Sequence, residues 1–157
     1  MPRWLRTPRL VGLSLLTGAT VFLPIARAQV PAGAAAEIYT GVGRLAIPLY
    51  PGNVLLDDAS WLPLITTGTV QPDFFAAIRT QGPGRVAVVG HDGFLTLATE
   101  SNPTFFANLI RWLGRNRAPR VFFSTGHREN NDATIATMLA AAGISSTTYD
   151  GSLTALG

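Results

Sequence analysis

The two histidines of this chain are the residues whose types and spacing could do chemistry. His91 and His127 each follow a glycine at the end of a short apolar run, and each is followed by charge: Asp92 after the first, Arg128 and Glu129 after the second. An open α/β sheet binds its ligands at the carboxyl ends of its strands, so neighbouring strands would bring both histidines to one crevice. The sequence therefore predicts a ligand site made of these five residues.

Two kinds of ligand suit such a crevice. Side chains of both charges can bind a polar ligand such as a glycan or a glycoprotein, and two imidazoles with a carboxylate can bind a metal ion. The structural alternative is that His91 hydrogen-bonds backbone at the end of its strand and that His127 is solvated. We prefer this structural alternative to a metal site more strongly than to a site for another ligand. We therefore expect no metal and no cofactor.

Several catalytic classes are excluded by residues that the chain lacks. It has no cysteine, so a disulfide, a thiolate zinc site and a cysteine nucleophile are impossible. It also has no Gly-x-Ser-x-Gly and no His-Glu-x-x-His. Asp57 and Asp58 near Trp61 could contact a carbohydrate, but adjacent residues on an extended strand point to opposite faces, and a turn is the simpler interpretation. We therefore expect no catalytic residue in this chain.

The N-terminus has the pattern of a Sec-type signal peptide. Three arginines lie within the first nine residues, an apolar stretch runs from Leu10 to Ile25, and Ala26-Arg27-Ala28 is a small-x-small cleavage site. We expect cleavage after Ala28 and export to the periplasm or beyond the cell, with membrane contact only through the uncleaved signal. The alternative is an uncleaved anchor, for which the stretch is short and Pro24 is badly placed.

Removal of residues 1–28 changes the charge of the chain. Four of the 12 basic residues lie there, which leaves eight against nine acidic ones and a formal net charge of −1 in place of +3. The pI of about 10.2 thus belongs to the precursor. A mature chain near neutrality gives no indication of nucleic acid as a partner.

The segment from Gly84 to Gly114 carries the strongest secondary-structure pattern. Arg85–Gly90 is a β-branched run typical of a strand buried on both faces. A helix follows, with Ser101 or Asn102 as its cap and Gly114 at its end. Pro103 fits the first turn of that helix. Its apolar residues recur with helical spacing at Phe106, Leu109, Ile110 and Leu113.

The rest of the chain is expected to alternate strands and helices. Strands are predicted at Arg44–Tyr50, Asn53–Asp57, Leu64–Val70, Arg120–Ser124 and Ile144–Tyr149. Helices are predicted at Gln71–Thr80 and from a cap at Asn131 or Asp132 to Gly143. This order implies right-handed crossovers and a mostly parallel sheet with flanking helices. We expect a signal at 1–28, a linker at 29–43 and one α/β domain at 44–157, incomplete at its C-terminus.

Three stretches together resemble a known family. They are Gly84–Leu95, Phe105–Gly114 with its Asn108, Trp112 and Leu113 pattern, and Arg120–Ser124. The chain resembles the glutamine-amidotransferase-like N-terminal module of secreted M60 (enhancin-like) metallopeptidases and TRPM8-channel-associated factors, and more distantly trehalose-utilisation-type domains. The resemblance implies a flavodoxin-like (class I glutamine-amidotransferase-like) fold and a larger protein whose catalytic part lies further on.

These observations predict a function in outline. The leading hypothesis is a non-catalytic binding or scaffold module of an exported bacterial protein, accessory to an M60-type architecture. One alternative is a fragment of a secreted hydrolase whose catalytic residues lie in downstream sequence. Another is a structural interaction domain with no small ligand.

Overall fold

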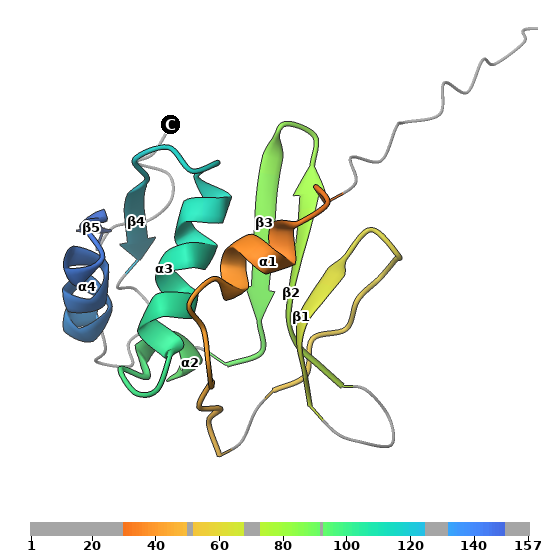
Figure 1. The fold of residues 1–157 in the computed structure, drawn as a ribbon, viewed down its shortest axis with the longest axis horizontal. Coiled ribbons are helices and arrows are strands. Elements are labelled where there is room, and N and C mark those ends of the chain that lie inside the picture. Colours follow the sequence, from red (N-terminus) through yellow and green to blue (C-terminus); the bar gives the residue numbers. More distant parts are fainter. Residues whose placement is uncertain (1–29, 50–51, 68–72, 92, 125–131, 150–157) are drawn as a thin grey trace, which may run out of the picture.

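The fold is taken from a computed structural model that describes residues 30–49, 52–67, 73–91, 93–124 and 132–149. These residues form two separate sheets, one of three strands in the order β1-β2-β3 and one of two strands, β4-β5 (Figure 1). The elements are α1 (Ala34–Tyr39), β1 (Leu62–Thr67), β2 (Asp73–Gln81), β3 (Gly84–Val89), α2 (Gly93–Thr96), α3 (Asn102–Leu113), β4 (Arg120–Ser124), α4 (Asp132–Ala141) and β5 (Ser145–Tyr149).

The predicted flavodoxin-like, mostly parallel sheet is wrong. The three-stranded sheet is antiparallel throughout, and only β4 and β5 pair in parallel. β3 and β4 belong to different sheets, so α3 is not a crossover between neighbouring strands. The described chain therefore contains one β-α-β unit, β4-α4-β5, beside an antiparallel meander.

The error begins at residues 73–81, which form the central strand β2 where Gln71–Thr80 was predicted to be a helix. Phe74, Ala77 and Ile78 have helical spacing, but all four residues from Phe75 to Ile78 are buried. A strand paired on both sides and covered on both faces has this uniform pattern rather than alternation. Pairing with β1 and β3 has overridden the local preference.

A tight turn at Gln81–Gly84 makes β2 and β3 a hairpin. Gln81 pairs with Gly84, so Gly82 and Pro83 are its two central residues. Gly82 has φ of +54°, which glycine adopts without steric cost. Proline fixes a negative φ at the next position, and this order of signs is that of a type II′ hairpin turn. A two-residue turn requires antiparallel strands, which settles the direction of β2 against β3.

Helix α3 lies between the two sheets and confirms the predicted helix (Figure 1). Phe105, Leu109 and Trp112 pack with β2 in one core cluster, whereas Phe106 and Ala107 pack with α4 in a second. Because α3 is buried on both sides, it joins the two parts of the core. Ser101 is the N-cap and Pro103 occupies the first turn, but Ser101 makes no capping hydrogen bond with its side chain.

Residues 34–39, in the middle of the predicted linker at 29–43, form the helix α1 instead. Ala34 and Ile38 of α1 are buried in the first core cluster. The ring of Tyr39 meets that of Phe105 edge to face, with centroids 5.4 Å apart, and its hydroxyl donates to the carbonyl of Leu64 at 2.6 Å. Burial raises the pKa of Tyr39. The folded part therefore begins before residue 44.

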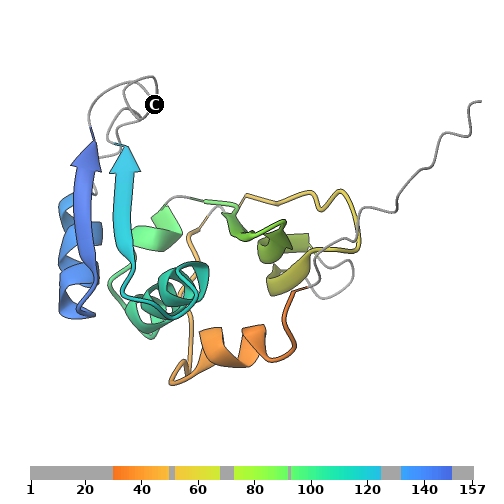
Figure 2. The same ribbon diagram turned by 90° about the horizontal axis from the view of Figure 1, so that it is seen from above.

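Two of the predicted strands, Arg44–Tyr50 and Asn53–Asp57, are extended segments without a sheet ladder in the described residues. Residues 42–48 form no strand, and residues 53–57 contribute a single bridge, Val54 to Phe74. The adjoining segment of residues 52–61 crosses the face of the sheet opposite α1 (Figure 2). Gly52 reaches Gly90 so closely that a Cβ on either residue would collide with the other's carbonyl.

The predicted order of strand, helix and strand at the C-terminal end of the described chain is confirmed. β4 and β5 pair in register from Arg120 with Ser145 to Ser124 with Tyr149, and α4 lies between them in sequence. Gly143 has φ of +71° just after α4, the left-handed position that favours glycine at a helix end. Asn131, one of the two predicted caps of α4, lies outside the described residues.

Candidate functional site

Of the five residues predicted to form a crevice, the structure describes His91. Asp92, His127, Arg128 and Glu129 lie outside the described residues. The crevice therefore stays a prediction. The strands expected to carry it, β3 and β4, lie in different sheets, so the argument from neighbouring strands no longer holds.

His91 lies at the start of the short helix α2 and binds its first turn. Its Nδ1 accepts a hydrogen bond from the backbone N–H of Gly93 at 2.9 Å, and its carbonyl accepts one from Phe94 at 3.2 Å. A Cβ at Gly93 would stand 3.0 Å from that same Nδ1, so the absence of a side chain there makes room for the imidazole. This matches the structural alternative for His91, a hydrogen bond to backbone at a strand end.

Replacing His91 by alanine should lower the free energy of unfolding by about 0.5–1.5 kcal/mol, the net value of one such hydrogen bond. His91→Asn should lose less, because an asparagine Oδ1 occupies nearly the position of the histidine Nδ1. Urea denaturation of both variants measures the difference. Equal losses for Asn and Ala would show that the contact to Gly93 does not stabilise α2.

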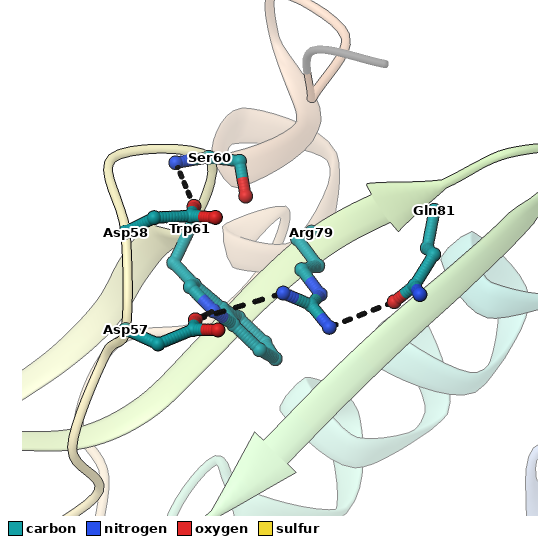
Figure 3. Close-up of polar contacts among 6 residues, drawn as sticks. All are labelled: Asp57, Asp58, Ser60, Trp61, Arg79 and Gln81. Carbon is teal, nitrogen blue, oxygen red and sulfur yellow. Dashed lines mark hydrogen bonds and ion pairs between the residues drawn. The ribbon is translucent and has the colours of Figure 1, made fainter. Parts of the chain in front are cut away.

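A second group of polar side chains gathers on the three-stranded sheet, and we call it the Trp61–Arg79 cluster: Asp57, Trp61, Arg79 and Gln81 (Figure 3). The guanidinium of Arg79 lies 4.4 Å from the centroid of the Trp61 ring. It also donates to Oε1 of Gln81 at 2.7 Å and lies 3.6 Å from Oδ1 of Asp57. The indole N–H of Trp61 donates to the same carboxylate oxygen at 2.6 Å.

The neighbouring Asp58 turns away from this cluster. Its Oδ1 accepts from the backbone N–H of Ser60 at 2.7 Å, which is an Asx turn (Figure 3). The predicted turn at Asp57–Asp58 is thus present, and the two carboxylates have different partners. Sequence reasoning missed Arg79 and Gln81 because it placed them at the end of a helix, where residues two apart do not share a face. Strand periodicity puts them side by side.

A third candidate is the edge of β4 that β5 does not occupy. Among the described residues, β4 pairs with β5 alone. A hollow of about 340 Å³ lies beside it, lined by Ile110, Leu113, Gly114, Pro119, Arg120, Val121 and Phe122. Phe122 is 60% exposed, and its ring centroid lies 5.9 Å from the guanidinium carbon of Arg120. The predicted strand at Arg120–Ser124 is thus present, and it exposes an aromatic ring at Phe122.

No protein-family model, curated protein or solved structure matches this chain. The function must therefore be argued from its own residues. Within the described ranges, no three histidine or carboxylate side chains gather as a metal site would require. None of the described helices is long and apolar enough to cross a membrane.

Proposed function

We propose that this chain is a non-catalytic binding or scaffold module that takes an extended polypeptide segment along the edge of β4. The observation that carries the proposal is the edge of β4 opposite β5. This edge has no strand partner among the described residues, and it lies beside an apolar hollow and the exposed ring of Phe122. Parallel sheets are ordinarily covered on both faces, and a two-stranded sheet is marginal without further partners.

The chemistry of such an edge fits a polypeptide partner. An added strand gains main-chain hydrogen bonds along its whole length, and alternate side chains of that strand enter pockets beside it. The hollow between the end of α3 and β4 is such a pocket, with Leu113 and Phe122 in its lining. Export and an accessory place beside an M60-type metallopeptidase remain part of the proposal on the sequence motifs alone.

Photocross-linking tests this function. p-Benzoylphenylalanine in place of Phe122 should form a covalent adduct with another polypeptide in bacteria that produce the protein. The same group in place of Leu55, which is 95% exposed on another segment, should form none. No adduct at position 122, or equal adducts at both positions, would contradict the proposal.

The same surface predicts a separation of stability from binding. Phe122→Ser should change the free energy of unfolding by less than about 0.5 kcal/mol, because surface substitutions away from the core have small effects. It should nevertheless weaken binding of the cross-linked partner, measured with purified components. A large loss of stability would show that Phe122 belongs to the fold and not to a docking surface.

A further inference from the structure

We propose that the Trp61–Arg79 cluster is a binding site for a neutral carbohydrate. This site is separate from the edge of β4 and goes beyond the function proposed above. It lies on the face of the three-stranded sheet that the segment of residues 52–61 crosses, opposite α1 (Figures 2 and 3).

The indole ring of Trp61 is held in place before any ligand arrives. The guanidinium of Arg79 stacks on this ring at 4.4 Å, and the indole N–H of Trp61 donates to Asp57 at 2.6 Å. Arg79 extends from β2, where its backbone pairs with Val86 of β3. A ring that is already oriented loses little conformational freedom on binding, and a partly exposed aromatic ring offers a flat apolar surface to the C–H face of a sugar.

Polar groups that can bind sugar hydroxyls surround the indole ring of Trp61. The carboxylate of Asp57 is 72% exposed, and an ionised carboxylate has about four acceptor sites, more than its two contacts in the cluster use. Gln81 is exposed and accepts from Arg79 through Oε1, so its amide N–H groups point away from that bond. Sugar hydroxyls both donate and accept, and these two side chains supply the matching acceptor and donor.

The Nε of Arg79 is buried and has no hydrogen-bond partner among the described residues. A buried donor without an acceptor is uncommon in native proteins and is often met by a water or a ligand oxygen.

Charge selects the class of carbohydrate. The positive charge of Arg79 is paired with the negative charge of Asp57. The two charges cancel, so the cluster has no excess positive charge that would attract uronic or sialic acids. A neutral sugar needs no such counter-charge, so the cluster fits neutral oligosaccharides.

Saturation-transfer NMR and calorimetry with defined tetrasaccharides test the proposal. The neutral probes are cellotetraose, maltotetraose, mannotetraose and chitotetraose, and tetragalacturonate is the charged probe. We expect at least one neutral probe to bind with Kd below about 1 mM. Trp61→Ala should weaken that binding by about tenfold or more, equivalent to about 1.4 kcal/mol. Leu49→Ser, at an exposed position outside the cluster, should leave it unchanged.

Thermal melting identifies variants that have unfolded, and Asp57→Asn and Gln81→Ala give further tests at exposed positions. Both should weaken binding while the melting temperature stays near that of the parent protein. The proposal is overturned if no neutral probe binds at about 10 mM, if only tetragalacturonate binds, or if binding survives Trp61→Ala. The cross-linking at position 122 does not involve Trp61, so either proposal can fail without the other.

Discussion

Replacing Trp112 by alanine is expected to lower the free energy of unfolding by about 3–5 kcal/mol, the range for truncating a buried tryptophan. Trp112 is 1% exposed and packs in the first core cluster between α3 and the three-stranded sheet. The guanidinium of Arg85 from β3 stacks on its ring at 4.7 Å and also donates to its carbonyl oxygen. Loss of the ring would leave a cavity and would also remove the stacking partner of Arg85.

Urea denaturation of the purified protein measures this loss, with Trp61→Ala as the matched control. Trp61 is the same residue type in a partly exposed position, so its truncation should cost about 1 kcal/mol. The comparison separates the effect of burial from that of removing an indole. Similar losses for the two variants would contradict the assignment of Trp112 to the core.

The sequence predicts the C-terminal half of the described fold well. The α3 helix and the β4-α4-β5 unit have local signals, because periodic apolar residues, a proline in the first turn and glycines at helix ends act within a few residues of each other. Gly114 and Gly143 lie at the ends that were predicted for them. Neighbouring residues in the chain determine these features, so no distant contact had to be known.

The N-terminal half depends on contacts that sequence periodicity does not contain. Residues 73–81 have an apolar pattern that fits a helix, and their strand conformation arises from pairing with β1 and β3. Once β2 is a strand, the Gly82-Pro83 turn makes the sheet antiparallel, and the flavodoxin-like interpretation fails at that step. One wrong assignment thus changed the predicted topology of the whole sheet.

In the candidate sites, too, local sequence signals predicted some features, and the others depend on contacts between distant segments. His91 was predicted correctly to end a strand, because the glycine and the polar residues that follow are local signals. Two partners of Arg79, Asp57 and Trp61, come from a loop that lies 22 and 18 residues earlier, so their meeting could not be predicted while the strand was assigned as a helix. The edge of β4 also required the topology, since a parallel strand in a larger sheet has neighbours on both sides.

Polar side chains of α3 explain why the extended N-terminal segment needs no sheet ladder. Ser101 accepts from the N–H of Gly43 at 3.1 Å, and Asn102 makes two hydrogen bonds to Ala46. These contacts satisfy backbone groups of the extended segment that would otherwise need strand partners. Asn108 donates to the carbonyls of Ile38 and Thr40, at the end of α1, at 3.1 and 2.8 Å. The side chains of Ser101 and Asn102, which were predicted to cap α3, therefore hold a distant segment instead.

Asn102→Ala is expected to lower the free energy of unfolding by about 2–4 kcal/mol, because two hydrogen bonds are lost and two partly buried backbone groups are left without partners. Oδ1 of Asn102 accepts from the N–H of Ala46 at 2.9 Å, and Nδ2 donates to the carbonyl of Ala46 at 3.0 Å. Asn102 is 2% exposed and is the buried polar residue among those described. Asn102→Asp should also destabilise, since a carboxylate keeps the acceptor, loses the donor and places a charge in the core.

Asn108→Ala is the matched control, because it removes the same side chain from the same helix but breaks contacts that are less buried. It should cost about 1 kcal/mol. Hydrogen exchange gives a second readout. In Asn102→Ala the amide of Ala46 should exchange faster, because the segment around it opens locally. The exchange rates of amides in β2 and α3 should change only as far as the global stability of the protein changes. If the Ala46 amide kept its protection in a folded Asn102→Ala protein, Asn102 would not be what holds this segment, and packing of Leu45 and Ile47 against the core would have to do so.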